Sequence, residues 1–192
     1  ENSEKAILEV LELGATGVVV PFVQTAEDVA RAARALLYPP AGQRGTCTLT
    51  RAARYGGLRS GFVAHALRQN EDVVLVAQIE DRQGVENIEA IVACSPGLDA
   101  LVIGRSDLAS SLGAPGQVEH PAVIEATHRV IAATQAGARK VPPGVGLYSP
   151  GEAARWIDAG CRMFFYSADT AMLLNAARAA ADGFRAALDE KR

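Results

Sequence analysis

Glu80 and Asp107 each follow an apolar run, and they are the residues of this chain best placed to do chemistry. Residues 73–79 (VVLVAQI) lead into Glu80, and residues 100–103 (ALVI) come shortly before Asp107. Apolar runs of this kind are typical of strands buried on both faces of a parallel sheet. Ligands bind at the carboxyl ends of such strands. One interpretation is therefore a site in which two carboxylates hold a hard divalent cation, Mg²⁺ or Mn²⁺.

A purely structural interpretation fits the same spacing. Asp107 can cap a helix that starts near Leu108, and Glu80 can be a solvated acid in a loop. Gly104, just before the second acid, would let the backbone approach a ligand closely. The spacing alone leaves both interpretations open.

Strands and helices alternate along the chain, which predicts an α/β fold with a parallel sheet. The expected strands are 17–23, 73–80, 100–107, 143–148 and 162–166. The expected helices are 3–13, 25–37, 87–94, 121–136 and 150–158, a helix-like stretch at 60–69, and an alanine-rich helix near the carboxyl end. Five parallel strands do not close an eight-stranded barrel, so periodicity leaves a small open sheet or the later part of a barrel. No linker interrupts the chain, which predicts a single domain over 1–192.

Composition and charge narrow the functional class. The net charge of −3 argues against nucleic-acid binding. No apolar run approaches the roughly 20 residues of a membrane span. Cys47, Cys94 and Cys161 lie far apart without a CxxC pair, which indicates a reducing compartment. We therefore expect a cytoplasmic protein.

Four short motifs occur in order along the chain. They are Val20-Pro-Phe-Val-Gln24, Tyr38-Pro-Pro-Ala-Gly-Gln-Arg-Gly45, Gln78-Ile-Glu80 with Gly84 and Asn87, and Gly104-Arg-Ser-Asp-Leu-Ala109. Together they resemble the metal-dependent class II pyruvate aldolases, the 4-hydroxy-2-oxoheptanedioate and 2-dehydro-3-deoxyglucarate aldolase family. That family is related to the citrate lyase β-subunit and lies in the phosphoenolpyruvate/pyruvate barrel superfamily. The resemblance implies a (β/α)₈ TIM-barrel type fold, of which this chain supplies about five βα units, strands four to eight, with the earlier units absent.

The resemblance also implies roles for individual residues. Glu80 and Asp107 match the metal ligands of the family, and the backbone of Ser106 and Asp107 matches the part that holds the substrate carboxylate. Gln78 matches a residue that lines the site, and Thr48 matches a small hydroxyl position that reaches the substrate. The implied reaction is the aldol cleavage of a 4-hydroxy-2-oxo acid to pyruvate and an aldehyde, or the reverse condensation, through a metal-stabilised enolate.

Two departures from the family pattern stand out. Arg105 replaces the proline of the common Gly-Pro-x-Asp-Leu motif and could alter substrate choice. The family's histidine base and the arginine that polarises the keto group lie on earlier strands, which would precede Glu1. His65 is the one histidine here that merits a test as a base, because His120 is expected to cap a helix and His128 to lie in mid-helix.

Two alternative functions remain open. One is citrate-lyase-like cleavage of a 3-hydroxyacyl-CoA ester, and the other is a non-catalytic remnant that binds a metal and 2-oxo acids. The expected partner is a small 2-oxo acid. In the family the carboxyl-terminal helix, which here starts near Met172, packs on a neighbouring subunit and implies a homo-oligomer. Arg44 is expected to tie down the loop of the second motif.

Overall fold

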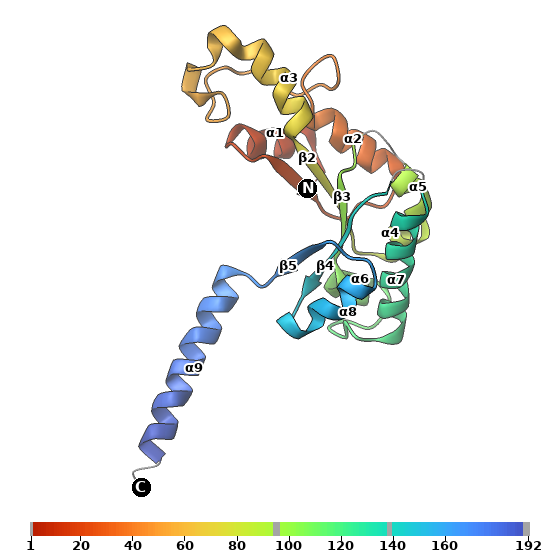
Figure 1. Cartoon of the computed structure of the whole chain (residues 1–192), viewed down its shortest axis with the longest axis vertical. Helices are drawn as coiled ribbons and strands as arrows, with labels where there is room; N and C mark the ends of the chain where they lie inside the picture. Colours follow the sequence, from red (N-terminus) through yellow and green to blue (C-terminus); the bar gives the residue numbers. More distant parts are fainter. Residues whose placement is uncertain (1, 94–96, 138–139, 190–192) are drawn as a thin grey trace.

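The computed structural model describes residues 2–93, 97–137 and 140–189, and its centre is one curled, five-stranded parallel sheet (Figure 1). The strands are β1 (Gly17–Val20), β2 (Val74–Ile79), β3 (Ala100–Ile103), β4 (Pro143–Leu147) and β5 (Met163–Tyr166). Each strand pairs in parallel with the next one along the chain, in the order β1-β2-β3-β4-β5. The predicted α/β class and the five predicted strands are confirmed.

Helices connect these strands and begin where the sequence provides caps. They are α1 (Glu4–Glu12), α2 (Ala26–Leu36), α3 (Phe62–Asp72), α4 (Arg82–Glu86), α5 (Ile88–Ala93), α6 (Arg105–Ser111), α7 (Pro121–Ala136), α8 (Ala153–Asp158) and α9 (Asp169–Asp189), with 3₁₀ turns at Arg54–Gly56, Arg59–Gly61 and Pro150–Glu152. Ser3 accepts a hydrogen bond from the Ala6 amide, and Thr25 forms a capping box with Asp28. These side chains satisfy amide groups that a helix start leaves free.

Several elements differ from the prediction. The third strand ends at Ile103 and does not continue to residue 107, because helix α6 starts at Arg105. The first strand ends at Val20 and does not continue to residue 23, because Pro21 lacks an amide donor and Phe22 turns to a φ of 51°. The short helix α4 was not predicted; Asp81 caps it by accepting from the Gly84 amide at 2.8 Å. Cys94 and residues 190–192 of the charged end lie outside the described residues.

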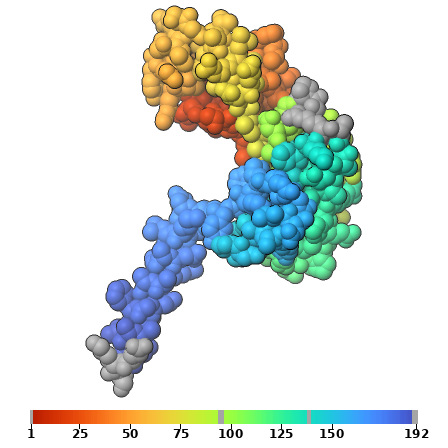
Figure 2. Space-filling view, viewed as in Figure 1, coloured from red at the N-terminus to blue at the C-terminus, as the bar shows by residue number. Residues whose placement is uncertain are grey.

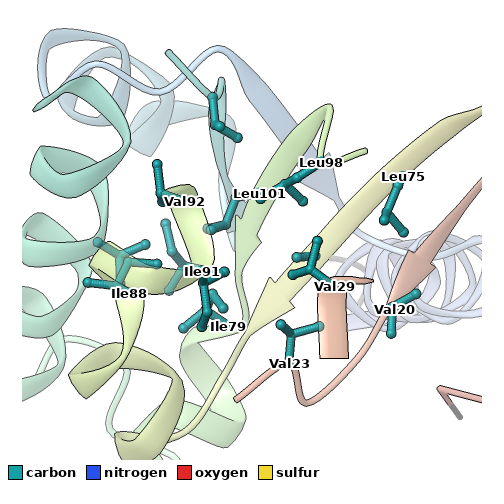
Figure 3. Close-up of a cluster of buried hydrophobic side chains, with 14 of the residues drawn as sticks. Val20, Val23, Val29, Leu75, Ile79, Ile88, Ile91, Val92, Leu98 and Leu101 are labelled. Atoms are coloured by element: carbon teal, nitrogen blue, oxygen red, sulfur yellow. The ribbon is translucent and has the colours of Figure 1, made fainter. Parts of the chain in front are cut away.

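Alternate residues of the strands point to opposite faces of the sheet, and the two faces are packed differently. The outer face forms the main core with the helices (Figure 3), including Leu75, Ala77, Ile79, Leu101, Ile103 and Val145 from strands and Val29, Ile88, Ile91 and Val130 from helices. The inner face carries a small cluster of Val76, Ala100 and Val102. Val19 and Val74 on this face remain 42% exposed, so the inner face is less completely covered.

Helix α9 stands away from the rest of the chain (Figures 1 and 2). None of its described residues is buried. Across the described ranges, no helix combines the length and apolar character needed to cross a membrane.

Candidate active site

Glu80 follows β2 directly and is almost fully buried, at 1% exposure. Its Oε1 accepts a hydrogen bond from the Phe22 amide at 3.0 Å, and its Oε2 accepts one from the Gln78 side-chain amide. Phe22 presents its amide from the left-handed region of backbone space, which is uncommon for a bulky residue and is often found at functional sites. The interpretation of Glu80 as a solvated loop acid is therefore wrong.

Asp107 reaches the same edge of the sheet from the first turn of α6. The Gly104 amide donates to the Ile79 carbonyl at 2.9 Å, which places the end of β3 beside the end of β2. Helix α6 begins at Arg105, with Gly104 at the cap position. Asp107 therefore lies inside the helix and does not cap it, so the capping interpretation is also wrong.

The two carboxyl groups face each other closely enough to interact. Burial raises the pKa of Glu80, and Asp107 raises it further as a neighbouring negative charge and hydrogen-bond partner. The hydrogen bonds from Gln78 and Phe22 act in the opposite direction. In the part of the chain that the structure describes, no cationic side chain forms an ion pair with either acid.

This donor set fits a divalent cation. A buried carboxylate beside a second one is costly unless a positive charge offsets it, and oxygen ligands suit Mg²⁺ or Mn²⁺. Among residues 2–93, 97–137 and 140–189, no cluster of three or more His, Cys, Asp or Glu could hold a metal, so Glu80 and Asp107 would leave other coordination positions to water or substrate oxygens. Gly104 is required here, because a Cβ at that position would lie 2.5 Å from Glu80 Oε2.

Three polar residues clamp the loops that follow β1 and β2. The Gln24 side-chain amide donates to Asp81, and the Asn87 side-chain amide donates to the Gln24 carbonyl at 2.9 Å. Residues from two of the sequence motifs thus touch one another. These contacts hold the Phe22 loop against the end of β2, where the Phe22 amide can donate to Glu80.

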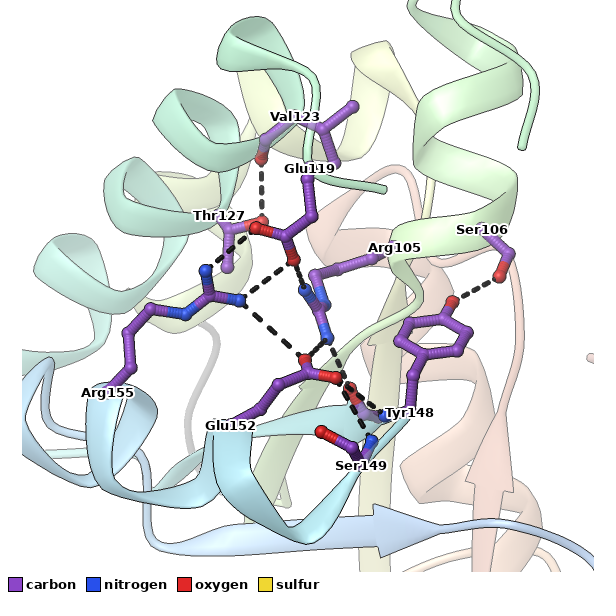
Figure 4. A network of polar contacts seen from close by, with 10 residues as sticks. Arg105, Ser106, Glu119, Val123, Thr127, Tyr148, Ser149, Glu152 and Arg155 are labelled. Atoms are coloured by element: carbon purple, nitrogen blue, oxygen red, sulfur yellow. Dashed lines mark hydrogen bonds and ion pairs between the residues drawn. The ribbon is translucent and has the colours of Figure 1, made fainter. Parts of the chain in front are cut away.

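Arg105 sits in a buried polar network on the β4 side of this edge (Figure 4). Its Nη2 donates to the Gly146 carbonyl at 2.8 Å and to Glu152 Oε2 at 2.7 Å, while Nη1 donates to Glu119 Oε1 at 3.0 Å. The residue is only 2% exposed, and its guanidinium carbon lies 4.9 Å from the centre of the Trp156 ring. Arg105 therefore joins the end of β3 to the segment that follows β4.

The acids of this network stay charged. Hydrogen bonds from Arg155, with its positive charge and that of Arg105, hold the pKa of Glu119 below its usual value. Burial tends to raise the pKa of Glu152, but hydrogen bonds from Arg105 and from the backbone outweigh it, and the net shift is downward. The network is thus a set of true ion pairs.

Ser106 and Gln78 both lie at the edge that holds Glu80 and Asp107. The Ser106 hydroxyl is 2.5 Å from the Tyr148 hydroxyl. The sequence analysis did not single out Tyr148, although it is the last residue of the predicted strand 143–148 and the carboxyl-end rule could have found it. Four of the predicted site residues are therefore brought together.

Thr48 lies at the opposite edge of the sheet, with the loop of the second motif. The nearby Ala52 amide donates to the Glu12 carbonyl at 3.2 Å, and α1 ends there, just before β1 begins. Arg44 forms a buried ion pair with Glu12 at 3.1 Å and covers the Tyr38 ring at 4.4 Å. The prediction that Arg44 ties down this loop is confirmed, whereas Thr48 does not reach the acid pair within one chain.

None of the three histidines is placed as a base for this site. His65 lies on α3, which leads into the amino end of β2, at the far edge from Asp107 (Figure 1). His120 caps α7 as predicted, since its Nδ1 accepts from the Ala122 amide at 3.3 Å. His128, in mid-helix, places its ring 5.6 Å from that of Trp156.

The chain is similar to several proteins of known family and known structure. The sequence model of a family described as HpcH/HpaI aldolase/citrate lyase matches residues 1–141. The 5-keto-4-deoxy-D-glucarate aldolase of Citrobacter koseri is 31% identical over 184 residues, which are 96% of this chain and 69% of that protein. The crystal structure of an HpcH/HpaI aldolase/citrate lyase family protein from Burkholderia cenocepacia matches with a TM-score of 0.86 at 34% identity, over 96% of this chain and 70% of that one.

A second solved structure of the same family is also similar to this chain. The HpcH/HpaI aldolase of Desulfitobacterium hafniense matches with a TM-score of 0.85 at 28% identity, over 95% of this chain and 69% of that one. The chain therefore belongs to the HpcH/HpaI aldolase/citrate lyase family.

Proposed function

We propose that this chain acts as a carbon–carbon lyase that cleaves a 4-hydroxy-2-oxo acid into pyruvate and an aldehyde, with a divalent cation held by Glu80 and Asp107. Membership of an aldolase family supports the lyase class. The observation that carries the site is the buried Glu80 carboxylate, which lies close to Asp107 and forms no ion pair with a cationic side chain among the described residues.

Each residue of the site has a distinct task in this proposal. Glu80 and Asp107 hold the cation, which, when bound, supplies the positive charge that stabilises a developing oxyanion on the keto oxygen. Gln78 and the Phe22 amide fix the orientation of the Glu80 carboxylate. The backbone at Ser106 and Asp107 receives the substrate carboxylate, as the family resemblance implies.

Proton transfer requires a base, and the histidines of this chain lie elsewhere. We propose that the base and the arginine that polarises the keto group come from outside residues 1–192. Thr48 can take part only where its loop reaches the site of another protomer.

The fold suggests a larger architecture. We propose that residues 1–192 form a single domain of the (β/α)₈ barrel type, with β1 to β5 as its strands four to eight. The sequential parallel order and the incompletely covered inner face, where Val19, Val74 and Phe165 are more than 40% exposed, support this assignment.

Helix α9 supports an assembly of identical chains. Its apolar side chains include Leu173 at 73%, Phe184 at 74% and Leu188 at 67% exposure. Large apolar side chains gathered on one unpacked helix mark an interaction surface. We propose that α9 packs on a second copy of the chain, which light scattering would detect as a loss of mass on substituting Leu173→Asp. A cytoplasmic location stays a prediction from the scattered cysteines.

One experiment tests the reaction. The protein, including any residues that precede Glu1, is incubated with pyruvate and Mg²⁺ in D₂O, and exchange of the methyl protons is followed by NMR. Cation-dependent exchange that disappears in Asp107→Asn is the expected result. Cation binding without exchange would favour the non-catalytic alternative instead.

A further inference from the structure

Tyr148 shares a face and an edge of the sheet with the proposed cation site. Val145 and Leu147 of β4 point into the main core, so Tyr148 occupies the opposite face of the sheet. The same alternation puts Ile79 in the core and Glu80 on the inner face. Both residues stand at the carboxyl end of their strands, where ligands of parallel sheets bind.

The Tyr148 hydroxyl is paired with the hydroxyl of Ser106, the neighbour of Asp107. The two oxygens are 2.5 Å apart, and either one can be the donor (Figure 4). Two hydroxyl groups have two hydrogens between them, and the hydrogen bond that joins the two groups uses one of these. The pair therefore keeps one hydrogen to donate and several lone pairs to accept with, whichever way the inner bond runs. Tyr148 is 55% exposed, so these groups are accessible.

The pair is held in place by the buried network beneath it. Glu152 Oε1 accepts from the Tyr148 amide at 3.2 Å, and Glu152 Oε2 pairs with Arg105 at 2.7 Å. The guanidinium carbon of Arg105 lies 5.2 Å from the centre of the Tyr148 ring, and Arg105 directly precedes Ser106. Arg105 is thus a positioning residue for both hydroxyls, and a preorganised pair loses little entropy when it binds a ligand.

We propose that the Ser106–Tyr148 hydroxyl pair binds a hydroxyl group on the aldehyde half of the substrate, so that hydroxyaldehydes are the preferred partners of pyruvate. The inference rests on the proposed function, in which the cation and the backbone of Ser106 and Asp107 hold the pyruvate half. The side-chain hydroxyls of the pair are then left for the other half. A substrate hydroxyl can both donate to and accept from the pair.

A carboxylate on the aldehyde half fits this position less well. Both terminal nitrogens of Arg105 are already bonded to Glu119, Glu152 and a backbone carbonyl. The pair therefore selects a neutral polar group.

Two substrates that differ by one hydroxyl test this inference. The kcat/KM for release of pyruvate is measured in saturating Mg²⁺ for 4,5-dihydroxy-2-oxopentanoate and 4-hydroxy-2-oxopentanoate, with the protein that includes any residues preceding Glu1. We expect kcat/KM to be about tenfold higher for the dihydroxy compound, since one hydrogen bond contributes about that factor. In Tyr148→Phe, which keeps the ring over Arg105, the ratio should fall to about one. The control Tyr55→Phe, at a residue 74% exposed on the opposite side, should keep the ratio.

The outcomes separate this inference from the function on which it depends. Cation-dependent cleavage of both compounds with equal kcat/KM, or a ratio unchanged in Tyr148→Phe, would overturn the hydroxyl subsite alone. Failure of both compounds to be cleaved in the presence of Mg²⁺ would overturn the proposed function, and the subsite with it.

Discussion

Replacing either acid of the site should remove a stabilisation that depends on the divalent cation. A ligand that binds only the folded chain stabilises it by about 2.7 kcal/mol when its concentration is 100 times its Kd. For a chain of this size about 1 kcal/mol shifts Tm by roughly 2–4 °C, so the cation should raise Tm by about 5–11 °C. In Glu80→Gln and Asp107→Asn that rise should vanish, because each substitution removes one of the two charged ligands.

The assay is thermal unfolding followed by circular dichroism, in Mg²⁺ and in EDTA. Glu89→Gln is a matched control, since Glu89 is 67% exposed on α5 and pairs with Arg129 at 3.5 Å, away from the site. It should keep the full rise in Tm. The same rise in Glu80→Gln as in the parent protein would refute the assignment of the cation to this pair.

The pH dependence of the stability of the fold, measured without metal, is a second test of the environment of Glu80. Its folded-state pKa is raised by burial first and by Asp107 second, so the ionised form destabilises the fold. That destabilisation is fully present above the folded pKa and is relieved as pH falls from there towards the ordinary value of 4.5. In EDTA, Glu80→Gln should therefore be more stable than the parent at pH 8, and the gap should close as pH falls. A stability difference between Glu80→Gln and the parent that widens towards pH 5 would contradict the burial of this carboxylate beside Asp107.

Three further predictions concern the surroundings of the site. Gly104→Ala should abolish cation binding in calorimetry without changing a ligand, because the new Cβ would lie 2.5 Å from the Glu80 carboxylate, whereas Gly146→Ala, which meets nothing within 4 Å, should bind normally. Arg105→Ala should cost about 1.5–3 kcal/mol in urea unfolding, because the two acids lose their hydrogen bonds to the buried guanidinium and keep only their pairs with Arg155; a loss below about 0.5 kcal/mol would contradict the network. Iodoacetamide at pH 8 should label the exposed Cys47 and spare Cys161, whose pKa burial raises to about 11, as peptide mass spectrometry would show.

The sequence predicted those parts of the site that depend on local pattern. The apolar run before Glu80 placed that acid directly after a strand, and the second run placed Asp107 just beyond the next strand, although it lies in the first turn of α6. The register of β2 and β3 brings the two strand ends together. Contacts between distant segments could not be predicted this way. The left-handed turn at Phe22 and the pairing of Tyr148 with Ser106 depend on how neighbouring loops fold over the sheet. Such loop geometry leaves no periodic signal in the chain.

Thr48 is a second residue whose spatial position could not be predicted from the sequence pattern. A motif fixes the order of residues along the chain, but the connection from α2 to β2 runs at the amino edge of the sheet. Within one chain that connection cannot bring Thr48 to the carboxyl edge.

The hydrogen bond from the Phe22 amide to Glu80 makes one proton of the backbone a natural probe of the carboxylate. That proton senses whether the acceptor oxygen is ionised, protonated or shared with a cation. Its chemical shift in a ¹⁵N-correlated spectrum should therefore move with pH and with added Mg²⁺, and its exchange with solvent deuterium should slow as the site fills. Titrations could then be followed at one resonance, without a substrate and without a chemical label.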